Sequence, residues 1–194
     1  MTDTTAPPRF RQGAGRLCLD YLRTLRYRGT PRPEEELADG AALAAWVRQC
    51  GPALDTSRSA AEPTDAAVRE ARALREAVYA LIAAARAGDG AVAAPSVRTR
   101  LNRAAAQPVP VPRLAPDGEL RWRAEEPVGA VLALVARDAL ELAAAPALLA
   151  RLHECAAADC GAVFLDASRP GTRRWCSMDV CGNRAKKSTY RART

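Results

Sequence analysis

The sequence predicts an α+β fold, in which a mostly helical N-terminal domain with a small β element precedes a small module organised by cysteines. Three observations support this prediction. Apolar residues recur at helical spacing in several segments of the first 147 residues. One segment, 108–126, alternates apolar and polar residues as strands do. Four of the six cysteines lie within residues 155–181, and the length of 194 residues allows one medium domain plus a small module.

Three helices are expected in the first half of the chain. The first is predicted over residues 17–29, where apolar side chains recur every three or four positions. Asp39 is a candidate N-cap of the second helix, and Gly51 lies just past its end. Thr64 is a candidate N-cap of a long third helix that ends at Gly88.

The second half of the N-terminal domain is predicted to contain two more helices and a hairpin. A short helix is expected over 96–107. Two strands follow within 108–126, joined by a turn at Pro116, Asp117 and Gly118. Pro127 fits the first turn of a helix that runs to about Ala145. A boundary near Pro146 divides the chain into domains at 1–147 and 148–194.

The basic charge of the chain is concentrated at its C-terminal end. The formal net charge is +7, and residues 169–194 carry eight Lys or Arg side chains against Asp179 alone. Residues 1–168 contain equal numbers of acidic and basic side chains. Clustered cations without acidic partners favour a nucleic-acid contact, although a solvated tail is the alternative. The chain has neither an uncharged apolar run of membrane-spanning length nor a secretory signal, so we expect a cytoplasmic protein without membrane contact.

The cysteine spacing predicts a metal site. The pattern is Cys155-x4-Cys160-x15-Cys176-x4-Cys181, in which two pairs are separated by a segment long enough for a hairpin. Four thiolates suit one structural Zn²⁺, which supplies folding free energy to a module too small for a sufficient core. Buried or incidental thiols, two disulfides and an iron–sulfur cluster are the alternatives, and reduced cytosolic thiols favour zinc. His153 is expected to flank the site on a strand over 149–154, and Cys18 and Cys50 to pack in the core.

The finger is predicted to consist of a knuckle, a hairpin and a helix that carries ligands, in that order along the chain. A strand is expected over 163–166 and a turn over 167–172. A helix capped by Ser177 or Asp179 then runs to Arg191. We expect the DNA-contacting side chains to come from this helix and from the arm before it: Arg173, Arg174, Arg184, Lys186, Lys187 and Arg191. Asn183 could reach a base, but a role in fixing the local backbone is favoured.

The C-terminal residues closely resemble the CGNR zinc-finger family. The segment 176–187 reads Cys-Ser-Met-Asp-Val-Cys-Gly-Asn-Arg-Ala-Lys-Lys, after an Arg-Arg-Trp at 173–175. The upstream pair of cysteines and the Phe-Leu-Asp at 164–166 resemble the first half of the same motif. This resemblance covers residues 148–194 and implies a treble-clef zinc finger that binds DNA.

The N-terminal region resembles the ABATE domain, the usual partner of that finger. The resemblance rests on the Gly-Arg-Leu-Cys-Leu-Asp-Tyr-Leu-Arg-Thr at 15–24, the Leu-Arg-Glu-Ala at 74–77, and Asn102. Family members usually read Asp-Phe-Val-Asn-Thr near 20–24, where this chain has Tyr21, Leu22 and Arg23. The resemblance implies a mixed α/β domain that binds an unknown ligand in a stress-responsive transcription regulator.

These observations lead to a predicted zinc-containing, DNA-binding transcription regulator. A small effector could bind the N-terminal domain. The candidates for its pocket are Tyr21, Arg23, Trp46 and Arg75. For each of them, core packing or surface pairing is the favoured interpretation. The alternative is a zinc-stabilised module that binds RNA or a protein. An enzyme is not expected, because four cysteines fill the zinc shell and the acidic run 34–36 is interpreted as a solvated face. One finger covers little DNA, so a homodimer is plausible.

Overall fold

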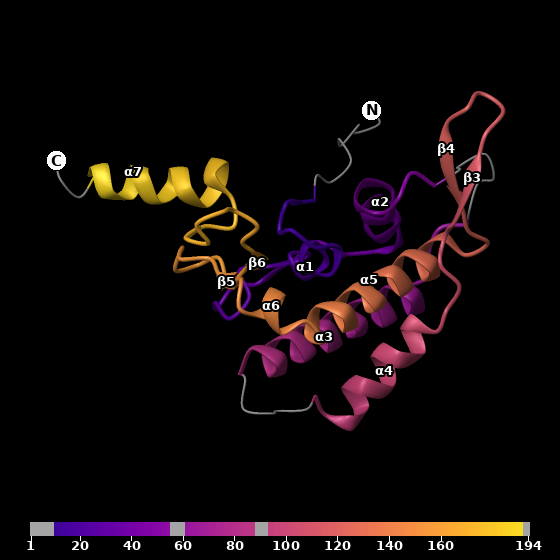
Figure 1. The fold of residues 1–194 in the computed structure, drawn as a ribbon, viewed down its shortest axis with the longest axis horizontal. Coiled ribbons are helices and arrows are strands. Elements are labelled where there is room, and N and C mark those ends of the chain that lie inside the picture. The colour runs from indigo at the N-terminus through magenta and orange to yellow at the C-terminus, as the bar shows by residue number, and fades with distance from the viewer. Residues whose placement is uncertain (1–9, 55–60, 88–92, 192–194) are drawn as a thin grey trace.

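Helix α5 (Pro127–Ala143) is the central element of the N-terminal domain. A computed structural model describes residues 10–54, 61–87 and 93–191, with side chains through Lys187. In it, α5 contacts α1 (Leu17–Leu22), α2 (Gly40–Cys50), α3 (Asp65–Ala87) and α4 (Pro95–Ala105) (Figure 1). Four buried alanines on α5 let its neighbours approach closely, and its buried valines and leucine fill the core between them. The predicted, mostly helical N-terminal domain is confirmed.

The predicted helix starts agree with local capping chemistry. The Asp39 carboxylate accepts a hydrogen bond from the Ala42 N–H at 2.8 Å, and the Thr64 hydroxyl accepts one from the Ala67 N–H at 3.3 Å. Pro95 and Pro127 each occupy the first turn of a helix, where a missing N–H costs nothing. The predicted end of α3 at Gly88 lies outside the described residues.

The first helix is shorter than predicted. It ends at Leu22, and strand β1 (Leu25–Arg26) then pairs antiparallel with β2 (Glu34–Glu35). Tyr27 has a φ of 52°, a left-handed conformation that a continuing helix excludes. The prediction of a solvated acidic run is also wrong for Glu35, whose carboxylate accepts hydrogen bonds at 2.7 and 2.6 Å from the buried Arg75.

The predicted hairpin is present and projects from the helical body (Figure 1). Strand β3 (Val111–Leu114) pairs antiparallel with β4 (Leu120–Arg123), and the turn between them contains Gly118 with a φ of 82°. The outer edge of β4 is held to the body because the Trp122 N–H donates to the Ala53 carbonyl at 3.0 Å. This hydrogen bond anchors the hairpin to the body through β4.

The cysteine module follows the N-terminal domain without a break in the core. Pro146 begins a one-turn helix, α6 (Pro146–Leu149), so the predicted strand starts later, as β5 (Leu152–Glu154). It pairs antiparallel with β6 (Val163–Leu165), and a π-helical turn, η1 (Met178–Gly182), leads into α7 (Asn183–Arg191). The Leu165 N–H donates to the Ala14 carbonyl at 2.8 Å, which ties β6 to the start of the N-terminal domain. Within the described chain, no helix has the length and apolarity needed to cross a membrane.

Candidate metal centre and nucleic-acid interface

The structure brings all four predicted cysteine ligands together. Their Sγ atoms lie within 4.8 Å of one another, and the side chains are buried. Cys160 and Cys176 are separated by 3.6 Å, Cys176 and Cys181 by 3.8 Å, and Cys181 and Cys160 by 3.7 Å. Four thiolates about 2.3 Å from a tetrahedral zinc ion lie about 3.8 Å apart. The cluster therefore has the dimensions of a closed four-sulfur zinc site.

Short backbone turns place the sulfurs. The Cys160 N–H donates to the Ala157 carbonyl at 2.9 Å, which closes the first knuckle, and the Cys155 N–H donates to Ala162 at 2.9 Å. The Cys176 N–H lies 3.5 Å from the Cys155 Sγ, so the backbone of the second pair already donates to a sulfur of the first. An N–H donated to a thiolate stabilises its charge, as in other tetrathiolate sites.

Hydrogen bonding and burial shift the pKa values of three of these cysteines in opposite directions. Hydrogen bonding from Cys176 lowers the pKa of Cys160 to about 5, despite burial. The same hydrogen bond, and then burial, raise the pKa of Cys176, while burial raises the pKa of Cys181 to about 11. Zinc binds the thiolate form, so a cysteine whose pKa is raised must lose its proton on binding, and zinc binding becomes stronger as the pH rises.

Two of the predicted DNA-contacting arginines are bound within the finger. The Arg184 guanidinium makes a bidentate pair with Asp159, at 2.8 and 2.7 Å, and its Nη2 lies 3.9 Å from the Cys181 Sγ. The Arg173 Nε donates to the Trp175 carbonyl at 2.8 Å, and its guanidinium lies over the Phe164 ring. The Arg184 pair connects α7 to the knuckle between Cys155 and Cys160. The Arg173 contacts connect the segment before Cys176 to the core of the finger.

Three of the other predicted contacts have exposed side chains. Lys186 and Lys187 are exposed on α7, and neither has a hydrogen bond or ion pair to another described residue. Arg174 is exposed and lies 5.1 Å from the centre of the Trp175 ring. Arg191 lies in α7, but its side chain is outside the described part of the chain. The Asn183 amide donates to the Asp179 carbonyl at 3.2 Å, the backbone role that the sequence favoured.

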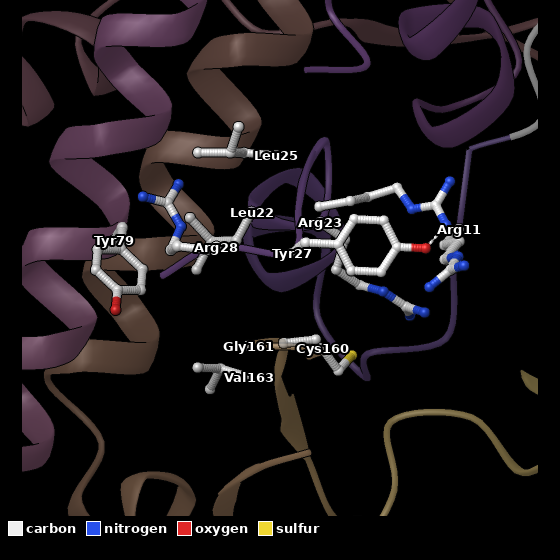
Figure 2. A pocket seen from close by; sticks show the side chains of 12 residues that line it. Arg11, Leu22, Arg23, Leu25, Tyr27, Arg28, Tyr79, Cys160, Gly161 and Val163 are labelled. Carbon is white, nitrogen blue, oxygen red and sulfur yellow. Dashed lines mark hydrogen bonds between the residues drawn. The ribbon is translucent and has the colours of Figure 1, made fainter. Parts of the chain in front are cut away.

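The four weak ligand candidates occupy different environments. Tyr21 and Trp46 are fully buried with ring centres 4.7 Å apart, and the Tyr21 hydroxyl donates to the Ala71 carbonyl at 2.6 Å. Arg75 is buried and paired with Glu35. Only Arg23 of the four lines a described pocket, which lies between the N-terminal domain and residues 160–163 of the finger (Figure 2).

Two acidic residues that support the finger were given no role of their own from the sequence, although one of them, Asp166, ends the Phe-Leu-Asp segment of the finger motif. Asp166 is fully buried and accepts hydrogen bonds from the Ser168 N–H at 2.9 Å and the Arg173 N–H at 2.8 Å. Hydrogen bonds from Ser168 and then from Arg173 lower its pKa to about 2. An aspartate two residues before a turn serine is a recognisable signal for such a bond. Asp159 carries no comparable signal, because its partner Arg184 is 25 residues away.

Comparison with protein families assigns both parts of the chain. Residues 15–146 match the model of the ABATE family, described as "Putative stress-induced transcription regulator". Residues 151–194 match the model of the CGNR zinc finger. Comparison with curated proteins finds no match. The finger match and the four-sulfur geometry together identify a structural zinc site at Cys155, Cys160, Cys176 and Cys181.

Proposed function

The chain belongs to the ABATE family and ends in a CGNR zinc finger, and from this premise we propose that it is a DNA-binding transcription regulator. The observation that carries the proposal is the placement of α7. This helix starts at the zinc centre and extends away from the rest of the molecule (Figure 1), with Lys186 and Lys187 exposed on it. A cationic helix held at its base by a metal site can approach a duplex without moving the body of the protein.

The contact that we propose is mainly with phosphates. Ammonium groups without acidic partners neutralise phosphates and release counterions, which gives affinity and a strong dependence on salt. Base recognition needs side chains that reach into a groove. Arg174 and Arg191 are the remaining candidates for either role, since the guanidinium groups of Arg173 and Arg184 have partners within the finger.

The zinc ion has a structural role in this proposal. Four thiolates complete a tetrahedral shell, which leaves no open position for the water or substrate that a catalytic zinc requires. The proposal is therefore of a non-enzymatic protein, located in the cytoplasm, where these thiols would remain reduced and available to zinc. The finger is proposed to have a treble-clef arrangement of knuckle, hairpin and helix.

The test is DNA binding by the zinc-loaded full chain, measured by fluorescence anisotropy over a range of salt concentrations. Each lysine that contacts a phosphate adds about one unit to the slope of log K against log salt. We expect Lys186→Ala/Lys187→Ala to reduce the slope by about 2 and to weaken binding to all duplexes alike.

The matched control is Arg113→Ala/Arg123→Ala, which removes the same formal charge from the β3–β4 hairpin at the far end of the molecule (Figure 1). Equal losses in the two double variants would mean that binding follows net charge and not α7. Preferred binding of single-stranded RNA, or of a protein and not a duplex, would replace the proposal with an RNA- or protein-interaction module. Selection from random duplexes then establishes whether a sequence is read.

Two further parts of the proposal concern the N-terminal domain and the assembly. A small effector bound to this domain would stabilise it by an amount that grows with the logarithm of the ligand excess over Kd, and a thermal-shift screen measures the resulting rise in melting temperature. Two chains on one DNA would double the small area that one finger covers. Light scattering on the protein–DNA complex gives the number of chains directly.

A further inference from the structure

Arg23 is a buried cation with few partners. It lies directly after α1 and is 5% exposed. Its Nη1 donates to the Gln12 carbonyl at 2.9 Å, and the nearest carboxylate oxygen, on Asp20, is 3.7 Å away. That carboxylate already accepts the Ala14 N–H at 2.8 Å. Removing a guanidinium from water is costly unless an opposite charge compensates for it, so the neighbourhood of Arg23 needs a stronger counter-charge than Asp20 alone.

The finger forms the wall opposite Arg23. Arg23 and Cys160 line the same pocket, whose volume of about 20 Å³ leaves space for about one water molecule (Figure 2). Gly161 closes the contact, because a Cβ there would lie 2.5 Å from the Arg28 carbonyl oxygen. The pocket is too narrow for an effector. Its two walls, from the N-terminal domain and from the finger, are in close contact at Gly161.

Arg23 differs from the other arginines of this pocket. Arg26 lies 3.5 and 3.3 Å from the carboxylates of Glu34 and Glu36, and Arg28 makes a bidentate pair with Glu76. Arg11 is partly exposed, so water can solvate its charge. Only Arg23 combines deep burial with a weak acidic partner among the described arginines of the pocket.

The missing counter-charge is present in the finger. A zinc ion with four thiolates carries a net charge of about −2. Arg23 lines the same pocket as the zinc ligand Cys160, so its buried guanidinium belongs to the wall of the N-terminal domain that faces this centre. A buried positive charge facing a centre of net negative charge is stabilised by it and stabilises it in turn.

We propose that Arg23 is the positive counter-charge that the N-terminal domain places beside the zinc–thiolate centre, so that zinc binding and docking of the finger onto this domain stabilise each other. Such coupling is reciprocal: whatever loosens the docking weakens zinc binding, and zinc removal loosens the docking by the same free energy. Arg23 is a positioning residue here and not a zinc ligand. The proposal depends on the zinc site and not on DNA binding, so the two can fail separately.

The first test compares zinc affinity in three variants of the full chain by competition with a chromophoric chelator. Arg23→Gln removes the charge but keeps hydrogen-bond donors, and we expect it to lower zinc affinity about tenfold or more, as for other residues that support metal ligands. Arg23→Lys keeps the charge and should recover most of that loss. Arg26→Gln, from the same pocket, should bind zinc as the wild type does.

The second test needs no variant and covers the case in which Arg23→Gln does not fold. Amide exchange of the wild-type chain is measured with zinc and after chelation. The Leu165 N–H, which donates to the Ala14 carbonyl across the contact, should exchange faster without zinc, and so should residues 13–23. Unchanged exchange in 13–23 would overturn the proposal. So would equal zinc affinity in the wild type and Arg23→Gln, or an equal loss in Arg23→Gln and Arg23→Lys.

Discussion

Replacing Arg184 with alanine should destabilise the finger without removing a phosphate contact. The sequence places Arg184 on the basic face of the last helix, but the structure pairs both of its terminal nitrogens with Asp159, at 2.8 and 2.7 Å. The pair connects the first turn of α7 to the knuckle between the first two zinc ligands. A side chain held in this way positions the helix that carries the lysines.

The expected magnitude follows from the exposure of the pair. The side chains of Arg184 and Asp159 are 44% and 54% exposed, so water and salt screen their attraction. Exposed ion pairs contribute about 0.2–1 kcal/mol, and bidentate geometry favours the upper end of that range. We therefore expect a coupling free energy of about 1 kcal/mol between the two residues.

A double-mutant cycle measures this coupling. Unfolding by urea is followed in the zinc-loaded wild type, Arg184→Ala, Asp159→Ala and the double variant, and the non-additive part is the coupling. The salt slope of DNA binding is measured on the same four proteins. A coupling below about 0.2 kcal/mol, together with a slope that falls by about 1 in Arg184→Ala, would refute the reasoning and make Arg184 a phosphate contact.

Two further predictions concern acidic residues. Glu35→Gln removes the nearer of the two carboxylates that compensate the buried Arg75, the other being Glu76 at 3.1 Å, and should cost about 3 kcal/mol in urea unfolding. Glu34→Gln, at a carboxylate more than half exposed, should cost less than about 1 kcal/mol. Equal costs would contradict a buried pair. Hydrogen bonds from Ser168 and from the Arg173 N–H lower the pKa of Asp166 to about 2. The carboxylate should therefore stabilise the fold at pH values above its unfolded pKa of about 3.9, and this stabilisation should be lost as the pH falls through 2. Carboxyl NMR titration checks this, and a midpoint near 4 would contradict it.

The zinc ligands and most helices could be predicted because their signals are local. The four-residue spacing within each cysteine pair predicts a tight turn. The 15 residues between the two pairs are enough for strand β6 and for the segment that leads back to the second pair. Asp39 and Thr64 cap helices through bonds to N–H groups three residues away, which sequence reasoning reaches directly.

The first hairpin could not be predicted in the same way. Strands β1 and β2 have two residues each, too short for a detectable alternation, and Leu25 continues the helical pattern of α1. What decides the conformation is Arg75, forty residues beyond Glu35 in sequence, which binds that carboxylate inside the domain. Burial of a cation overrides a local helical preference because an unpaired buried charge costs more than a broken turn.

The sequence by itself determined which residues bind zinc, where the positive charge is concentrated and which segments are helical, since each depends on neighbours within a few positions. Only the tertiary structure decided what each arginine does. Arg23 faces the finger, Arg184 holds Asp159, and Lys186 and Lys187 are left exposed. The physical reason is that a long cationic side chain takes the nearest available anion, and folding, not chain order, determines which anion is near.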